Sequence, residues 1–424
     1  MEGLYMENAA FINILKEELV PATGCTEPIA VALCAAKARE ILGQTPDYVE
    51  VEASESIIKN VKSVIVPFTN HTKGIDAAAA IGIVGGKSEN LLNVLSEVTD
   101  AEIEQMKKFL AAVPVKISHS KSGRMLDITV TVKCGVDYAK VRIADYHTNI
   151  VHIERNGEVL LDKPLNKESF DTRTDRSLLT VEKIWDFAVN SDWKELPPIL
   201  DPQIEYNMAI SEEGLKHNYG ANIGKTLLSS YGEDIKVRAR AAAAAGSDAR
   251  MNGCELPVIT NSGSGNQGMA VSIPVITYAR ELKCSEEKMY RALALSNLIA
   301  IHQKTGIGAL SAYCGAMCAG IGAGCGIAYL LGAGLDAIKH TIINGLATVS
   351  GIICDGAKAS CAAKIATAVE AGINGYMSHL GGNDFIFGDG IIGEDVEDTI
   401  KNVGLLASEG MRSTNETIID IMIK

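Results

Sequence analysis

Thirty-one consecutive residues without a charged side chain, 305–335, constrain the fold of this chain more than any other feature. The run is long enough to raise the question of a membrane span, but nine of its residues are glycine, and its flanks lack an aromatic belt and a basic bias. Small residues let helix backbones approach closely, and the spacing of Gly320 and Gly324 fits such a contact. We therefore predict two packed helices that break near 320–326, and no membrane span.

Half of the ten cysteines lie in or shortly after this run, at positions 314, 318, 325, 354 and 361. Ten cysteines in 424 residues do not resemble a small disulfide scaffold. The N-terminus is acidic and amphipathic and lacks the basic region of a secretory signal. We therefore expect a reducing cytoplasm, where clustered cysteines more often indicate a metal site or catalysis than disulfides.

The overall charge narrows the range of partners. The formal net charge is −13, and no basic cluster offsets it. Such a chain repels phosphate backbones, which argues against nucleic acid as a partner. A small-molecule ligand is the remaining expectation.

Two kinds of pattern divide the chain. Residues 113–161 alternate β-branched with charged side chains, and Asn156-Gly157 is a two-residue hairpin signal, so an antiparallel sheet of four or five strands is predicted there. Elsewhere alanine- and glycine-rich helical patterns dominate. We predict an α+β fold, a mainly α-helical catalytic domain with an inserted antiparallel-sheet α+β subdomain. The predicted divisions are 1–45, counted with the catalytic domain, 46–165 for the subdomain and 166–424 for the helical cluster- and substrate-binding part.

The segment TNSGSGNQG (260–268) is dense in hydrogen-bond donors. It contains GxGxxG, but no strand–helix–strand unit surrounds it, so a dinucleotide site is a weak interpretation. A cradle of backbone N–H groups at a helix start is the better one, and it would hold a carboxylate. The alternative is a polar turn without a ligand. The candidate substrate-binding residues are Ser262, Gly263, Ser264, Asn266 and Gln267.

Cys25 lies in the loop GCTEP (24–28), directly before a predicted helix at 29–42. A helix N-terminus favours the thiolate and lowers the pKa of a thiol. Cys25 is therefore a candidate nucleophile, base or metal ligand, and otherwise an incidental thiol in a turn. Cys34, in the middle of the helix, is interpreted as a small buried side chain.

Cys314, Cys354 and Cys361 are the candidate metal ligands. Thiolates suit zinc and iron–sulfur clusters alike, so the spacing does not name the metal. The absence of a tight CxxC pair argues against a structural zinc site. Cys318, Cys325, Cys284, Cys134 and Cys254 are interpreted as structural.

Four motifs in one order carry a resemblance to a known family: GCTEP, TNSGSGNQG, the Gly- and Cys-rich run 310–326, and CDGAKASC (354–361). Together they closely resemble the L-cysteine desulfidases, a serine-dehydratase-alpha-like family, and more distantly the bacterial iron–sulfur L-serine dehydratases. The resemblance covers nearly the whole chain. It implies a four-iron four-sulfur (4Fe-4S) cluster held by Cys314, Cys354 and Cys361. The dehydratases also carry a cysteine at the extreme C-terminus, which this chain lacks.

The resemblance also implies a reaction. An iron–sulfur lyase of this kind would eliminate the β-substituent of L-cysteine and yield pyruvate, ammonia and sulfide, with L-serine as the alternative substrate. Cys25 would act as the base or reach the fourth iron. Two other classes stay open, a pyridoxal-phosphate lyase and a non-enzymatic thiol or metal sensor. We expect a homo-oligomer, most simply a dimer.

Overall fold

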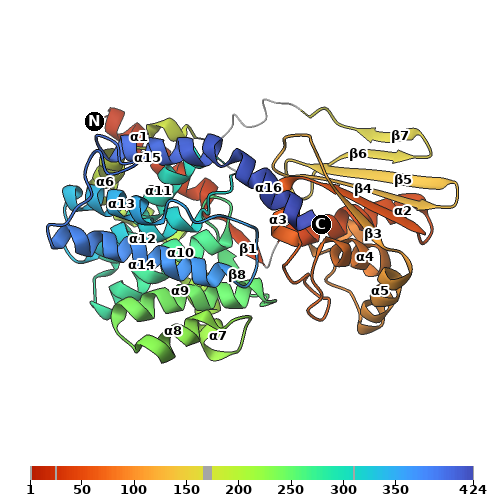
Figure 1. Ribbon diagram of the computed structural model, residues 1–424, viewed down its shortest axis with the longest axis horizontal. Helices are drawn as coiled ribbons and strands as arrows, with labels where there is room; N and C mark the ends of the chain where they lie inside the picture. The colour runs from red at the N-terminus through yellow and green to blue at the C-terminus, as the bar shows by residue number, and fades with distance from the viewer. Residues whose placement is uncertain (1, 24–25, 166–173, 309–310, 424) are drawn as a thin grey trace.

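The computed structural model describes residues 2–23, 26–165, 174–308 and 311–423. It has two parts, a large bundle of helices and a smaller sheet with helices packed against it (Figure 1). The predicted class, α+β and mainly helical, is confirmed. Within the described ranges, every helix is too short or too polar to cross a membrane.

The helical part contains eleven of the described helices and a short two-stranded sheet. The helices are α1 (Glu2–Glu18), α6 (Val181–Asn190), α7 (Pro197–Lys216), α8 (Ile223–Tyr231), α9 (Ile235–Met251), α10 (Gly265–Glu281), α11 (Glu286–Ile307), α12 (Ala316–Leu330), α13 (Leu335–Val349), α14 (Cys361–Leu380) and α15 (Val396–Leu405). Strands β1 (Pro21–Thr23) and β8 (Pro257–Ile259) pair antiparallel.

Helix α12 runs without interruption through the glycines where a break was predicted. Its glycines are sites of close approach: a Cβ on Gly320 would fall 2.3 Å from the Ala368 carbonyl carbon of α14, and one on Gly322 would fall 2.6 Å from the Ser296 carbonyl oxygen of α11. Helix α12 therefore packs closely between α11 and α14. This tertiary packing outweighs the poor helix propensity of glycine. The predicted break near 320–326 is wrong.

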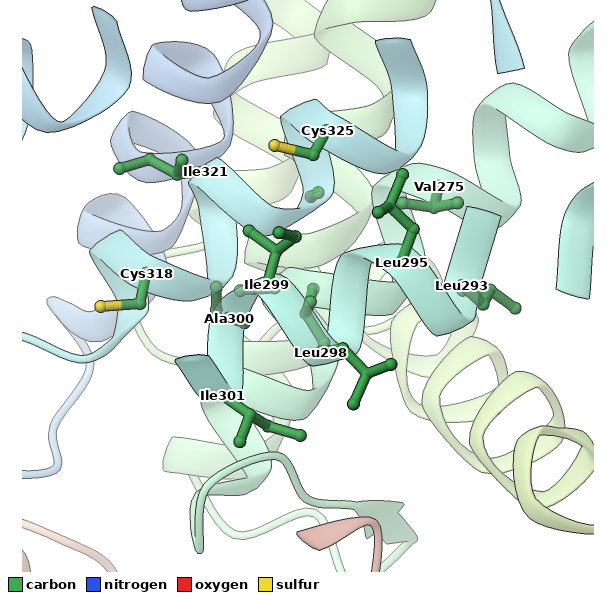
Figure 2. Close-up of a cluster of buried hydrophobic side chains, with 14 of the residues drawn as sticks. Val275, Leu293, Leu295, Leu298, Ile299, Ala300, Ile301, Cys318, Ile321 and Cys325 are labelled. Carbon is green, nitrogen blue, oxygen red and sulfur yellow. The ribbon is translucent and has the colours of Figure 1, made fainter. Parts of the chain in front are cut away.

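Cys318 and Cys325 lie on α12 in the apolar core between these helices (Figure 2). Both side chains are fully buried among aliphatic neighbours. Burial raises the pKa of Cys318 to about 12 and raises that of Cys325 further. Both are thus neutral, structural thiols, as predicted.

We expect Gly324→Ala to lower the melting temperature. The new methyl group would lie 2.5 Å from the carbonyl carbon of Gly372, so α12 and α14 must separate. Such overpacking typically costs about 1–3 kcal/mol, more than the gain of up to about 1 kcal/mol in helix propensity. Gly351→Ala is the control, because a Cβ there would meet no atom of the described chain within 4 Å. Equal melting temperatures for the two variants would contradict the close-packing argument.

The smaller part is built on a six-stranded sheet in the order β3-β2-β4-β5-β6-β7. Its strands are β2 (Tyr48–Ala53), β3 (Val115–His119), β4 (Asp127–Cys134), β5 (Asp137–Ala144), β6 (Ile150–Arg155) and β7 (Glu158–Asp162). Five of the strands, β3 to β7, begin within 113–161, which confirms the predicted number there. Strand β2 joins them from outside that range and pairs parallel with β3, whereas the other pairs are antiparallel, so the sheet is mixed and not wholly antiparallel as predicted. The hairpin at Asn156-Gly157 is confirmed, with φ of 51° and 86° at its two central residues.

Four helices accompany the sheet, α2 (Thr26–Leu42), α3 (Glu55–Val61), α4 (Ile75–Gly85) and α5 (Asp100–Ala112). Helix α2 packs in the core under the sheet, whereas the predicted division placed residues 1–45 with the helical part. The last helix, α16 (Arg412–Ile423), returns to this part, and its Ile419 joins the same core. The boundary between the two parts therefore lies between β1, which belongs to the helical part, and α2, which belongs to the sheet part.

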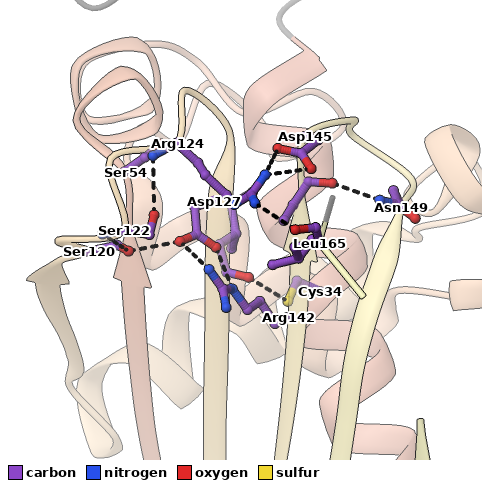
Figure 3. A network of polar contacts seen from close by, with 12 residues as sticks. Cys34, Ser54, Ser120, Ser122, Arg124, Asp127, Arg142, Asp145, Asn149 and Leu165 are labelled. Atoms are coloured by element: carbon purple, nitrogen blue, oxygen red, sulfur yellow. Dashed lines mark hydrogen bonds and ion pairs between the residues drawn. The ribbon is translucent and has the colours of Figure 1, made fainter. Parts of the chain in front are cut away.

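A buried polar network fixes one end of the sheet (Figure 3). Asp127 accepts hydrogen bonds from Arg142 at 2.7 and 2.9 Å, and Arg124 pairs with Asp145. Nearby, the Cys34 thiol donates to the Val141 carbonyl at 3.3 Å, which confirms Cys34 as a buried side chain. The network supports the loop 145–149, whose His147 lies against Thr26 at the start of α2.

Candidate functional site

A cavity of about 150 Å³ lies where the two parts of the molecule meet. Its walls contain residues of all four sequence motifs, together with residues outside them. From the motifs come Thr26, Glu27, Thr260, Gly263, Ser264, Gly265, Asn266, Gln267, Cys314, Gly315, Ala316, Cys354, Gly356, Ala357 and Cys361. From elsewhere come Ala22, Asn60, Arg250, Lys364 and Ile365. Segments far apart in the sequence thus share one small space.

Four helices begin at this cavity. The first residues of α2, α10, α12 and α14 all line it, at Thr26, Gly265, Ala316 and Cys361 respectively. The N-terminus of a helix carries unpaired N–H groups and a partial positive charge. Four converging N-termini make the cavity suited to anions, whether thiolates or a carboxylate.

Cys314 and Cys354 are brought together by two backbone segments that run side by side. The Cys314 N–H donates to the Ile352 carbonyl at 3.1 Å, and Tyr313 forms an antiparallel bridge with Ile353. The hydrogen bond from the Cys314 thiol, helped by the charge of Lys59, holds the pKa of Cys354 well below its ordinary range. The same hydrogen bond and burial raise the pKa of Cys314. Loss of a thiol proton, which metal binding requires, is therefore favoured at Cys354.

Cys361 lies on the same cavity, at the start of α14. Burial raises the pKa of its thiol. Among the described residues, the one group of three His, Cys, Asp or Glu ligand atoms that lie mutually within 4.8 Å does not include the cysteines. A single zinc ion with bonds of about 2.3 Å would hold its sulfurs roughly 4 Å apart. As they stand, the three thiols are therefore too far apart to share a single zinc ion.

Two lysines that the sequence analysis missed stand near the thiols. Lys59 of α3 is 6% exposed and donates to Asn415 Oδ1 at 2.7 Å, and Lys304 of α11 interacts electrostatically with Cys318, Cys354 and Cys314. Burial lowers the pKa of both lysines, while the neighbouring cysteines oppose that effect. Buried positive charge here stabilises negative charge on the sulfurs.

Asp355, directly after Cys354, forms ion pairs with two further lysines. Burial alone would raise its pKa, but hydrogen bonds from Lys358 and Lys364 lower it to about 2. Lys364 lines the cavity, and its ammonium group lies 2.5 Å from Asp355 Oδ1. The carboxylate thus anchors the cations beside the thiols.

The 260–268 loop is a tight turn followed by a capped helix. Asn261 and Ser264 exchange backbone hydrogen bonds of 3.1 and 3.0 Å around Ser262 and Gly263, whose φ values are 50° and 75°. The Ser264 hydroxyl accepts from the Gln267 N–H and caps α10, which begins at 265.

The five predicted substrate-binding residues do not all face the cavity. Gly263, Ser264, Asn266 and Gln267 line it, but Ser262 is absent from the described lining residues, and its hydroxyl donates to Asn261 Oδ1 at 2.9 Å. The Oδ1 atom of Asn266 is buried and has no hydrogen-bond partner among the described residues. A buried acceptor without a partner costs free energy, which a bound donor would recover.

Arg250, in the last turn of α9, is the principal cavity residue that the sequence analysis missed. A Cβ on Gly265 would fall 2.6 Å from its Nε, so the guanidinium lies directly against the start of α10. Similarly, a Cβ on Gly315 would fall 2.6 Å from Gln267 Oε1. Two glycines therefore let an arginine and an amide side chain pack against the helix starts.

Cys25 lies outside the described residues. Ala22 and Thr26, close to it on either side in the sequence, both line the cavity. The Thr26 hydroxyl lies 3.2 Å from Nε2 of His147, and Glu27 accepts from Asn60 at 3.1 Å. His147, interpreted from the sequence as a solvent-facing strand residue, lies half-buried in the loop 145–149 against this motif.

Comparisons with known proteins agree on one family. The model of the serine dehydratase alpha chain family matches residues 89–420. A UPF0597 protein of Desulfitobacterium hafniense is 56% identical over 97% of this chain and 96% of its own length. UPF0597 proteins of Lachnoclostridium phytofermentans and Treponema denticola are 53% and 48% identical, over 97% and 98% of this chain and 99% and 97% of their own. The chain belongs to the serine dehydratase alpha chain family.

Proposed function

We propose that the protein is a lyase that removes the β-substituent and the α-proton of a small L-amino acid. L-Cysteine is the proposed substrate, with pyruvate, ammonia and sulfide as products, and L-serine is the alternative. The observation that carries the proposal is that three cysteine thiols and an anion-binding helix start share one cavity of about 150 Å³. Membership of a serine dehydratase family supports the reaction type.

A 4Fe-4S cluster is the proposed cofactor, and Cys314, Cys354 and Cys361 would hold it. Their fit rests on three properties: a common cavity, a lowered pKa at Cys354, and a spacing too wide for a single ion. Lys59 and Lys304 would offset its negative charge. When bound, the cluster would supply a Lewis acid that polarises the β-substituent.

The substrate carboxylate is proposed to bind between the start of α10 and Arg250. The helix dipole and the guanidinium both favour an anion there, and a charged acceptor strengthens each hydrogen bond. The α-ammonium group would donate to Asn266 Oδ1, which otherwise has no partner among the described residues.

Cys25 is proposed as the base that accepts the Cα proton. As the proton leaves, its electron pair forms the Cα–Cβ double bond and the bond from Cβ to sulfur breaks, so that sulfide departs with the bonding pair. The resulting aminoacrylate becomes an imine and reacts with water to give pyruvate and ammonia. Because Cα protons are weakly acidic, donors to the carboxylate must stabilise the charge that builds up. Arg250 and the α10 amides are placed for that task.

We expect Asn266→Ala to raise the Michaelis constant roughly 10- to 100-fold, because a hydrogen bond to a charged group contributes about 1.5–3 kcal/mol. Ser262→Ala is the matched control on the same turn. Its hydroxyl bonds to Asn261 instead of facing the cavity, so we expect a smaller change. Steady-state pyruvate assays under anaerobic conditions measure both. Equal Michaelis constants in Asn266→Ala and the native enzyme would remove Asn266 from the substrate site.

The experiment that tests the function is anaerobic purification, followed by iron and sulfide analysis and by pyruvate assays with L-cysteine and L-serine. Bound iron with a higher kcat/KM for L-cysteine supports the proposal, and a preference for L-serine selects the alternative. A sharp aldimine absorption band would indicate pyridoxal phosphate instead. Reactive thiols without pyruvate from either amino acid would favour a thiol sensor. Gel filtration of the same sample tests the expected dimer.

A further inference from the structure

A second cluster of metal-binding side chains lies at the far end of α14 from the cavity. It consists of His340 on α13, His379 near the end of α14 and Asp384 in the loop that follows. His379 is 18 residues beyond Cys361, which at 1.5 Å per residue places it roughly 27 Å along the helix. The cluster is therefore separate from the proposed active site.

The ligand atoms of this cluster converge. Oδ2 of Asp384 lies 2.9 Å from Nδ1 of His379 and 3.4 Å from Nδ1 of His340, and one atom from each residue lies within 4.8 Å of the others. Tetrahedral zinc with bonds of about 2.0–2.1 Å keeps its nitrogen and oxygen ligands roughly 3.3 Å apart. The imidazole rings now stack at 4.9 Å with an interplanar angle of 11°. A tilt of each ring about its Cβ–Cγ bond would direct both lone pairs toward one point.

The hydrogen bonding of the cluster is incomplete. His340 Nδ1 is buried and has no hydrogen-bond partner among the described residues, although it faces Asp384. On the opposite ring edge, the carboxylate of Asp336 lies 4.0 Å from Nε2 of His340 and 4.0 Å from Nε2 of His379. Histidines that bind metals commonly donate their second N–H to a carboxylate, which fixes the ring orientation. Asp336 is placed to do this for both rings.

We propose that His340, His379 and Asp384 form a binding site for one divalent transition-metal ion of the zinc class, with Asp336 orienting the two imidazoles. Two imidazoles and one carboxylate are a ligand set that suits zinc, and they leave one position for water. The metal ion would give Nδ1 of His340 the partner that it lacks. The carboxylates of Asp384 and Asp336 would balance the charge of the ion.

The site would fasten a loop to the helices. The Asn344 side chain already donates to Asp384 Oδ1 at 2.8 Å and accepts from the Phe385 N–H at 2.9 Å. Ile386 and Phe387 follow, each with 65% of the residue exposed. A metal ion bound to Asp384 would therefore hold the base of an apolar loop against α13 and α14.

The test is zinc binding by the anaerobically purified, full-length protein with its iron content measured in the same sample. We expect one zinc ion per chain after free Zn²⁺ is removed, and we expect His340→Ala and His379→Ala each to weaken zinc binding at least about tenfold without loss of iron. His152→Ala is the matched control, because His152 also lies between two acidic residues, Glu154 and Asp162, and should leave zinc binding unchanged.

Two further variants keep the test decisive. Asp384→Asn replaces the alanine variants if these fail to fold, and Asp336→Asn should weaken zinc binding about tenfold through the orientation of the rings. Repeating the comparison in Cys354→Ala separates this site from the thiols, because histidine-dependent zinc must persist whatever happens to the iron. Equal zinc binding by the native protein and both histidine variants would overturn the proposal, as would the absence of bound zinc in the native protein.

Discussion

Replacing Cys354 with alanine is expected to strip the protein of most of its iron and to abolish pyruvate formation. Cys354 lies in the cavity, and the hydrogen bond from Cys314 together with the charge of Lys59 lowers its pKa, which favours the deprotonated form that a metal ligand needs. Its loss would leave the cluster one ligand short and would remove the hydrogen-bond partner of Cys314. Iron per chain, measured after anaerobic purification, and the visible absorption spectrum report the loss directly.

Cys314→Ala and Cys361→Ala should behave alike, whereas Cys34→Ala and Cys325→Ala should keep full iron because both thiols are buried in apolar cores away from the cavity. The ligand assignment would be rejected by a Cys354→Ala protein that retains iron and turnover. If Cys361→Ala alone retains iron and turnover, the third ligand is a different residue, and Cys25 is the leading candidate.

For Cys25→Ala we expect normal iron, a retained spectral change on adding substrate, and neither elimination nor exchange of the Cα proton. A base removes that proton before the β-substituent leaves, so its loss halts the reaction at the first step. The measurement is incubation with substrate in deuterated water, with the Cα–H signal followed by NMR. Cys25→Ser, which keeps a small polar side chain, is the companion variant.

Base and ligand roles for Cys25 lead to different results. As a ligand to the fourth iron, Cys25 would show itself through iron loss or a changed cluster spectrum upon substitution. Continued deuterium exchange in Cys25→Ala would point to a different base on the same wall. Glu27, which lines the cavity and accepts from Asn60, would then be the next residue to test.

Local chemistry made parts of the fold predictable. The Asn156-Gly157 hairpin was correct because a type I′ turn requires positive φ at both residues. Pro197-Pro198 opens α7, because the first N–H groups of a helix have no partner in any case. Asn222, with φ 50°, is the residue before α8. The parallel β2–β3 pair depends on contacts between distant segments, which periodicity does not report.

The candidate site was predictable where residues form motifs. Cys314, Cys354, Cys361 and residues 263–267 were named from the sequence, and they line one cavity. Lys59 and Asn60 lie in a short helix with no pattern of their own, so only the docking of the two parts brings them to the site. Arg250 gave no distinct signal, because a basic residue in the last turn of a helix is common.

The cavity is shared between two separate hydrophobic cores. Thr26, Glu27 and Asn60 belong to elements of the sheet part, and the thiols and the 263–267 loop belong to the helical part. Lys59 crosses this boundary as well, since its charge stabilises the Cys354 thiolate while its ammonium group bonds to Asn415. Loading the site and docking the two parts are therefore linked equilibria, and each must strengthen the other by the same factor. In a chain without the proposed cluster, the association between the two parts should accordingly be weaker.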